Sequence, residues 1–148
     1  MQSPVNIEIE NSHLILEWFG FWPSFHDAEV ISMGLHRSLQ GKEKGPLLTT
    51  TLYSSQMTSE LDEKNFYKLI KHCVIELEFE NIESVELEGF NHQNALDGIE
   101  FSEAKNFLGK PAISVVFNSA YGVGFDLICS KVRVASLTPG KPVDHLHA

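Results

Sequence analysis

The sequence has little positive charge, only two cysteines and no long hydrophobic run. Eleven Lys and Arg residues stand against twenty Asp and Glu residues, so the formal net charge is -9. This charge disfavours non-specific attraction to nucleic acid and to an anionic membrane surface, whereas it would steer a basic partner toward the protein. The composition therefore favours a basic protein as the partner, with no nucleic acid and no membrane involved.

The chain also lacks the usual marks of export. Nowhere do 18 apolar residues occur together, and residues 1–8 have neither the basic region nor the apolar run of a signal peptide. Cys73 and Cys129 each lie in an alternating apolar run, where a thiol serves as a small hydrophobic group, and we expect no disulfide between them. These features predict a cytoplasmic protein.

The motifs of common catalytic chemistries are missing as well. There is no glycine-rich phosphate loop, nucleophile elbow or paired-cysteine zinc motif, and Gly122-Val-Gly124 is typical of a hairpin turn between two strands. His145 and His147 would chelate a metal only weakly without a third rigid ligand. We therefore expect no metal, no cofactor and no catalytic residue.

Length and composition predict a single domain over residues 1–148. A chain of this size buries about two thirds of the surface that its unfolded form exposes. The hydrophobic fraction of 43% and the charged fraction of 21% are ordinary for a globular protein and argue against long disordered segments. Within this domain, residues 1–9 form a polar start and residues 139–148, with two prolines and two histidines, a loose tail.

One short helix is expected near the start of the chain. Asn11 or Ser12 can cap a helix that runs through Phe19, and Gly20 stops it. The proline at position 23 disfavours helical geometry for the residue before it, so the helix should not run on.

The following segment predicts a hairpin. Residues 27–37 show the period of a half-buried strand, residues 40–46 read as a loop, and residues 47–54 are rich in Thr, Leu and Tyr. We expect the two strands to pair. The alternating apolar residues of the first strand are Ile31, Met33 and Leu35.

The rest of the chain is dominated by further strands. Residues 55–65 are polar and indicate a loop, whereas residues 63–71 fit a short helix as well as a strand and stay open. The fold class is therefore α+β and mainly β, an antiparallel β-sandwich or partly open barrel of seven to eight strands with one short N-terminal helix. The further strands are predicted at residues 72–79, 84–90, 98–101, 112–118, 122–129 and 132–137.

Residues 18–30 gather five large aromatic side chains, a proline and a His-Asp pair. We interpret Trp22, Pro23, Phe25, His26 and Asp27 as a structural motif. An aromatic ring buries roughly 150 to 250 Å², so Trp22 and Phe25 would seal one end of the core. Asp27 would accept backbone N–H bonds at the strand entrance, and His26 would be held by packing and a hydrogen bond.

A metal-dependent hydrolase is the alternative interpretation of the same residues. Imidazole and carboxylate groups are good ligands of divalent metals, so His26, Asp27 and Glu29 with a carboxylate from elsewhere are candidates. In a regular strand Asp27 and Glu29 would share one face while His26 points to the other. A small-ligand-binding β-barrel with an internal cavity is a further alternative.

Glutamates alternate with apolar residues from position 75 to position 89. If residues 75–79 and 85–89 pair as a hairpin with their apolar side chains on one face, the glutamates share the other face. Buried ionised groups cost several kcal/mol each, so this carboxylate patch must meet solvent, a basic neighbour or a partner. It is either a solvated strand face or a docking surface for a basic protein. The predicted partner-binding residues are Glu76, Glu78, Glu86 and Glu88.

The motif Trp22-Pro-Ser-Phe-His-Asp-Ala-Glu-Val30, followed by a strand ending at Arg37, resembles that of the immunity proteins of bacterial polymorphic toxin systems, close to the immunity protein 50 family. The resemblance extends loosely to residues 74–79, 89–91 and 132–136. It implies a cytoplasmic inhibitor that binds and neutralises a cognate toxin, without a cofactor and without turnover. The oligomeric state is left open.

Overall fold

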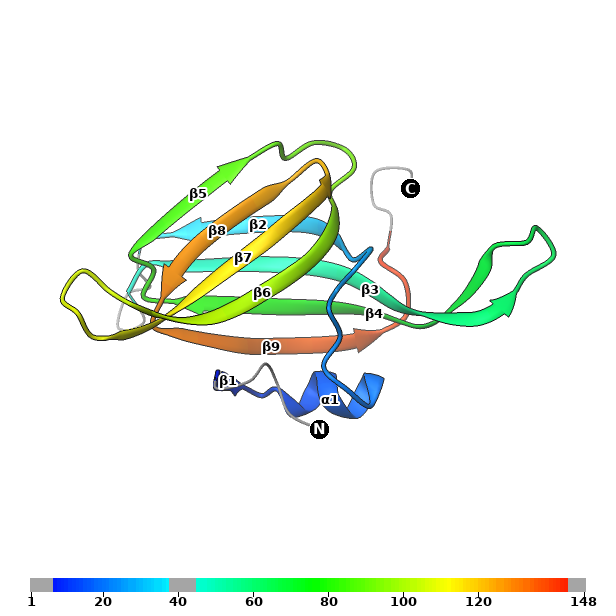
Figure 1. Ribbon diagram of the computed structural model, residues 1–148, viewed down its shortest axis with the longest axis horizontal. Helices are drawn as coiled ribbons and strands as arrows, with labels where there is room; N and C mark the ends of the chain where they lie inside the picture. The colour runs from blue at the N-terminus through cyan, green and yellow to red at the C-terminus, as the bar shows by residue number, and fades with distance from the viewer. Residues whose placement is uncertain (1–6, 38–44, 144–148) are drawn as a thin grey trace.

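The computed structural model describes residues 7–37 and 45–143, which form nine strands and one short helix (Figure 1). The elements are β1 (Ile9–Glu10), α1 (His13–Phe19), β2 (Glu29–His36), β3 (Leu47–Leu61), β4 (Tyr67–Glu80), β5 (Ser84–Glu88), β6 (Ala95–Lys105), β7 (Pro111–Tyr121), β8 (Gly124–Cys129) and β9 (Lys131–Pro139).

All nine strands belong to one open sheet in the order β1-β9-β4-β3-β2-β6-β7-β8-β5. The short β1 pairs with β9 in parallel, and every other described pair is antiparallel. The predicted class, mainly β with one short helix, is confirmed. The described residues form nine strands rather than seven or eight, and the sheet is not a closed barrel.

The sheet folds over on itself into two layers (Figure 1). The back layer holds β9, β4, β3 and β2, and the front layer holds β6, β7, β8 and β5. On one side the layers join where Glu29 pairs with Ala95. On the other side the chain turns the corner from β4 to β5 and from β8 to β9, and there Asn81 Nδ2 donates to Ser130 Oγ at 2.9 Å. Strands that change layers at a sharp bend are typical of orthogonally packed sheets.

Aromatic side chains from both layers meet in the core. The ring of Phe79 on β4 packs edge-on against Phe117 on β7 with 5.9 Å between centroids, and Phe117 stacks on Phe125 of β8 at 3.9 Å. Cys73 and Cys129 are buried and free. Burial raises the pKa of Cys73 to about 11 and that of Cys129 to about 12, so both thiols stay protonated at neutral pH and act as apolar core groups.

Helix α1 confirms the helix predicted from the sequence. Gly20 ends it with a φ of 85° and donates its backbone N–H to the carbonyl of Leu16, because glycine adopts the left-handed conformation without strain. Ser12 precedes the helix, but its side chain makes no capping bond. The helix packs its buried face, which includes Ile15 and Phe19, into the core. No helix in the described ranges is long and apolar enough to cross a membrane.

Strand β2 forms the predicted hairpin with β3 but breaks the expected alternation. The register shifts between Val30 and Ser32, a β-bulge that leaves Ile31 as an extra residue. Val30 is therefore buried, whereas Ile31 is 39% exposed and Leu35, near the end of the strand, is 59% exposed. The predicted burial pattern of this strand was wrong at these positions. Most of the loop predicted at residues 40–46 lies outside the described residues, which omit residues 38–44.

Strands β3 and β4 are longer than predicted, and their ends extend away from the layers as a two-stranded arm, defined as residues 55–71 (Figure 1). The predicted loop at residues 55–65 was wrong over residues 55–61, where β3 continues to Leu61, and is confirmed over residues 62–65. The open segment 63–71 is strand from Tyr67 onward rather than helix. At the tip, Asp62 Oδ1 accepts the backbone N–H groups of Lys64 at 2.8 Å and of Phe66 at 3.0 Å.

The β7–β8 turn and the two ends of the chain are short segments that were also predicted. Gly122 has a φ of 79° between β7 and β8, which confirms the hairpin turn at Gly122-Val-Gly124. The predicted polar start includes Ile9, the first residue of β1, and the predicted tail begins with the last residue of β9. His145 and His147 lie outside the described residues.

Candidate partner-binding surfaces

The aromatic residues of the 18–30 segment pack at the join between helix, loop and front layer. Phe25 is 2% exposed, and its φ of 66° places it in the left-handed region. Trp22, partly buried, packs edge-on against Phe25 at 5.9 Å and against Phe101 of β6 at 6.0 Å between centroids. Pro23 beside it is also partly buried. The rings therefore link the motif to the front layer.

The polar residues of this motif point outward. The His26 side chain is 60% exposed, its Nδ1 lies 3.2 Å from the carbonyl oxygen of Asp97, and its Nε2 lies 3.6 Å from Asp27 Oδ2. The backbone N–H of Asp27 donates to the carbonyl of Leu96 at 2.9 Å. Among the described residues the Asp27 carboxylate accepts no backbone N–H bond and instead faces His26, unlike the predicted arrangement.

The geometry proposed for a hydrolase site does not form. Both Phe25 and Asp27 have positive φ, and the strand begins only at Glu29, so alternation does not apply to residues 26 and 27. His26 and Asp27 therefore converge, while Glu29 lies opposite Tyr53 in the ladder. Within residues 7–37 and 45–143, no group of three His, Cys, Asp or Glu side chains is arranged to hold a metal ion.

The predicted hairpin between residues 75–79 and 85–89 was wrong. In the back layer β4 pairs with β3 and β9, whereas β5 is the edge strand of the front layer and pairs with β8. The intervening residues are the corner at which the chain changes layers rather than a hairpin turn. The alternation itself holds on β4, where Leu77 and Phe79 are buried and Glu76 is exposed. The four predicted glutamates therefore lie on the outer faces of two different layers.

Basic side chains of β9 meet carboxylates on the outer surface of the back layer, which we call the back face and define as Glu10, Glu76, Glu78, Lys131 and Arg133. Arg133 lies beside Glu78 in the ladder, and its Nη1 is 2.8 Å from Glu78 Oε1. Arg133 Nε is also 3.4 Å from Glu10 Oε2, which lies 3.2 Å from Lys131 Nζ. Glu76 has a weaker contact, a 3.4 Å hydrogen bond from Ser136 Oγ. Glu78 and Glu10 therefore have basic partners, whereas Glu76 contacts a neutral hydroxyl.

The front face, defined as the outward carboxylates Glu86, Glu88, Glu100 and Asp126, lies on β5, β6 and β8. Glu86 lies directly opposite Asp126, Asp126 opposite Val116, and Val116 opposite Glu100, so their side chains share the outer face. Glu100 accepts a 3.2 Å hydrogen bond from Asn118 Nδ2. Within the part of the chain that the structure describes, Glu86, Glu88 and Asp126 form no ion pair.

The front face is also hollowed. A depression of about 440 Å³ is lined by residues of β5, β7 and β8, among them Glu86, Glu88, Asn118 and Asp126. Sequence reasoning found two of the carboxylates but missed Asp126 and Glu100, because the pairing of β5 with β8 and of β7 with β6 could not be seen in the sequence. The alternation of β8, which buries Phe125 and Leu127, was the available signal for Asp126.

A second, larger groove of about 730 Å³ lies between β1, the start of β9, the end of β6 and the start of β7. Its lining is mixed, with Ile7, Ala112 and Ile113 beside Glu10 and Lys131. It opens at the end of the two layers and does not lie among the aromatic rings of the core. It is therefore not the internal cavity of a ligand-binding barrel.

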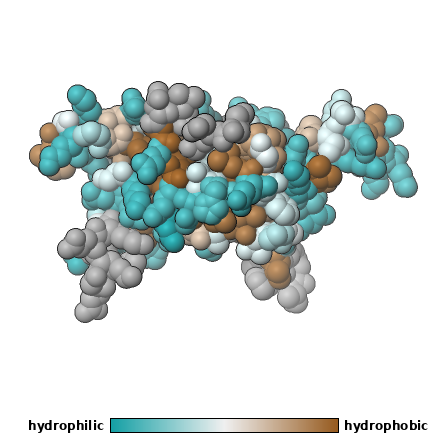
Figure 2. Space-filling view, turned by 90° about the horizontal axis from the view of Figure 1, so that it is seen from below, coloured by the Kyte–Doolittle hydropathy of each residue, from teal (hydrophilic) through white to brown (hydrophobic). Residues whose placement is uncertain are grey.

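The arm exposes apolar side chains in the predicted loop, residues 55–65, and in the open segment, residues 63–71. They stand among polar neighbours along the arm, at the right of Figure 2. Exposed large apolar groups on a projecting element mark a candidate binding surface. The exposed large apolar residues of the arm are Met57, Leu61, Phe66, Tyr67, Leu69 and Ile70.

Comparison with known proteins gives one assignment. No curated protein and no solved structure matches the chain. The family model described as Immunity protein 50 matches residues 11–140, a range that includes the aromatic motif, both layers and the arm. The chain therefore belongs to the immunity protein 50 family.

Proposed function

We propose that this protein is a non-catalytic inhibitor that binds and neutralises a cognate bacterial toxin in the cytoplasm. The observation that carries the proposal is the match to the immunity protein 50 family over residues 11–140. Neutralisation by binding requires a complementary surface and no cofactor.

The front face supplies the charge for this binding. Glu86, Glu88 and Asp126 project from neighbouring strands without a basic partner among the described residues, around a hollow of about 440 Å³. With a net charge of -9, the protein would attract a toxin with a basic surface, and such attraction acts chiefly on the association rate. The docking role predicted for four glutamates is thus proposed here for Glu86 and Glu88, joined by Asp126.

Co-expression tests the function. The protein is produced in bacteria together with each candidate toxin domain encoded in its own genome, and growth is compared with cells that carry the toxin alone. We expect restored growth with one toxin. Failure to protect against every candidate would contradict the proposed function.

Charge removal tests the front face. Glu86→Gln, Glu88→Gln and Asp126→Asn together should slow association with that toxin roughly tenfold at low salt. The matched control, Glu8→Gln, Glu17→Gln and Glu76→Gln, changes the net charge by the same amount at exposed positions off the front face. Equal association rates for the two triple variants would show that the charges of the front face have no special role.

A further inference from the structure

One face of the arm is apolar. Met57 lies opposite Leu69 and Leu61 lies opposite Tyr67, and residues opposite one another in a ladder project to the same side. Tyr67 and Leu69 are two residues apart on β4, so the two pairs share that side although the register shifts between them. These four side chains are 46% to 54% exposed. We call Met57, Leu61, Tyr67 and Leu69 the arm face. Ile70, opposite Gln56, projects to the other side.

The base of the arm is held in place by several hydrogen bonds. Trp18 Nε1 of α1 donates to the carbonyl of Lys71 at 2.9 Å, and the φ of 55° at Lys71 accompanies a register shift between the strands. The Tyr53 hydroxyl lies 2.6 Å from His72 Nδ1, and the two rings stack. Gly140 donates its N–H to the carbonyl of His72 at 2.7 Å. An arm anchored in this way needs little ordering when it binds, which favours affinity.

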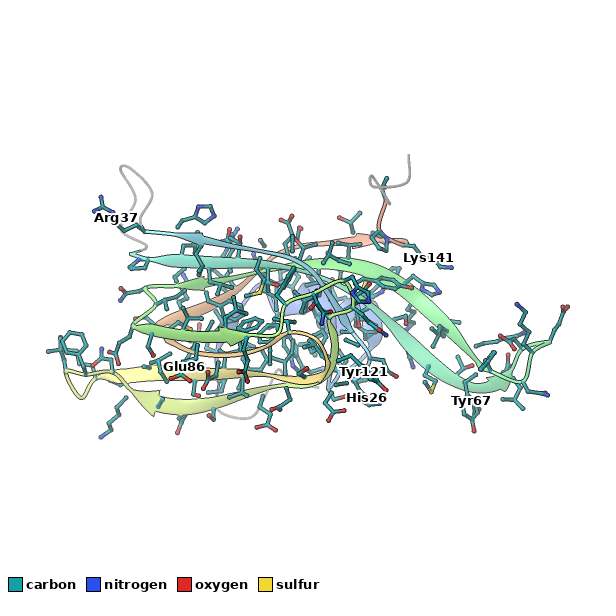
Figure 3. All side chains as sticks on the ribbon, turned by 90° about the horizontal axis from the view of Figure 1, so that it is seen from above. His26, Arg37, Tyr67, Glu86, Tyr121 and Lys141 are labelled. Carbon is teal, nitrogen blue, oxygen red and sulfur yellow. The ribbon has the colours of Figure 1, made fainter. Side chains whose placement is uncertain are left out.

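The arm face looks to the same side of the molecule as the front layer. In Figure 3 the front layer runs along the lower side of the view, and Tyr67 points to that side, as do His26 and Tyr121. A second copy of the chain carries the same net charge of -9, so like charges disfavour pairing of two copies. A basic protein that spans this side would meet the acidic front face toward one end and the arm face at the other, because Glu86 and Tyr67 lie far apart along the long axis in Figure 3.

We propose that the arm face inserts into an apolar cleft of the cognate toxin and forms the apolar part of the interface whose charge comes from the front face. This inference rests on the proposed function. Tyr and Met are enriched at interface centres, where apolar anchors provide most of the binding free energy, whereas charges at the rim act on encounter. The two surfaces therefore act on different rate constants.

The test uses the toxin domain selected by co-expression, carrying a substitution that abolishes its toxicity, as the probe. Surface plasmon resonance measures its association and dissociation rates. The variant Met57→Thr, Tyr67→Thr, Leu69→Thr removes the apolar groups and keeps residues that favour strands. We expect its dissociation rate to rise about 30-fold or more, the effect of losing one strong interface anchor, while the salt dependence of association stays as in the parent. Circular dichroism and the thermal midpoint establish that the variant folds.

Ile70→Thr is the matched control, because Ile70 is exposed to a similar degree on the opposite side of the same arm. We expect its dissociation rate to stay within about twofold of the parent. A folded arm-face variant that dissociates no faster than the parent would overturn the inference while leaving the proposed function intact. A concentration-dependent dimer that light scattering detects in the parent and not in the variant would also overturn it, by assigning the arm face to a second copy. A parent that binds none of the toxins defeats the function itself.

Discussion

The back and front faces carry similar rows of outward carboxylates, yet they differ in what stands beside those groups. On the back face Arg133 lies within 2.8 Å of Glu78 and 3.4 Å of Glu10. On the front face Glu86 stands opposite another carboxylate, Asp126, with no basic side chain paired to either among the described residues. Alternating glutamates therefore meet basic side chains in one layer, at Glu78, and none in the other as far as the described residues show.

This difference separates charges that support the fold from charges available for binding. The ion pairs of the back face join β1, β4 and β9, which come from distant parts of the chain. Directly opposed like charges on a sheet cost about 0.2 to 1 kcal/mol per pair, so the front face is slightly unfavourable in the free protein. A basic partner would relieve that repulsion on binding.

The largest effect expected of a single substitution at neutral pH concerns the aromatic contact that ties the motif to the front layer. Replacing Trp22 by Ala removes the packing against Phe25 and Phe101 and should lower the free energy of unfolding by about 3 kcal/mol, toward the low end for buried aromatics because Trp22 is partly exposed. Urea unfolding measures the change. Phe107→Ala, at an 80% exposed loop position, is the control and should have little effect. An unaltered unfolding free energy in Trp22→Ala would assign the motif to binding instead.

Local features were predictable from the sequence because they depend on neighbouring residues. The helix ending at Gly20, the glycine turn at Gly122 and the outward direction of Glu76 follow from capping, turn chemistry and strand alternation. The bulge at Ile31 was not predictable, because an extra residue is defined only by the partner strand.

Features that depend on distant segments were missed. The polar residues after Ser54 suggested a loop, but the arm is exposed on both faces and therefore needs no apolar alternation to remain a strand. Likewise, the short link between Glu80 and Ser84 looked like a hairpin turn. Hydrogen bonds with Pro46 and Ser130 instead hold it as a corner between the layers. The candidate front face could be found only in part, since Asp126 joins Glu86 through pairing across 40 residues of sequence.

The next effect tests whether the two layers unfold as one unit. Burial raises the thiol pKa of Cys73 in the back layer to about 11 and of Cys129 in the front layer to about 12, from an ordinary 9.0. Above pH 9 the unfolded chain loses these protons first, so stability present below pH 9 should fall by about 1.4 kcal/mol per pH unit for each thiol up to about pH 11. Denaturant unfolding at pH 8 to 11 measures the slope.

The controls for this slope are Cys73→Ala and Cys129→Ala. Each should remove one thiol's share of the pH dependence, whatever its effect on stability at pH 7, if both layers unfold together. A slope that only one of the two substitutions reduces would indicate that the layers unfold separately.

A smaller effect is expected from breaking the charge balance of the back face. Glu78→Gln removes the charge that Arg133 meets at 2.8 Å, while Arg133 keeps its contact with Glu10, so the free energy of unfolding should fall by about 1 kcal/mol. Urea unfolding is again the measurement. Glu76→Gln is the matched control and should change less, because the Glu76 carboxylate contacts the neutral Ser136 hydroxyl at 3.4 Å rather than an Arg side chain. Equal effects of the two substitutions would mean that Arg133 does not stabilise this face.

The smallest effect has the opposite sign and lies on the front face. Glu86→Gln removes the repulsion with Asp126 across the β5–β8 pair and should raise the free energy of unfolding by about 0.2 to 1 kcal/mol at low salt. Asp126→Asn should give a similar gain alone and little more when added to Glu86→Gln, because both substitutions relieve the same repulsion. In 1 M salt, where charges are screened beyond roughly 3 Å, the gain should disappear. If Glu86→Gln instead destabilised the protein as Glu78→Gln does, Glu86 would support the fold, and the contrast between the two faces would be lost.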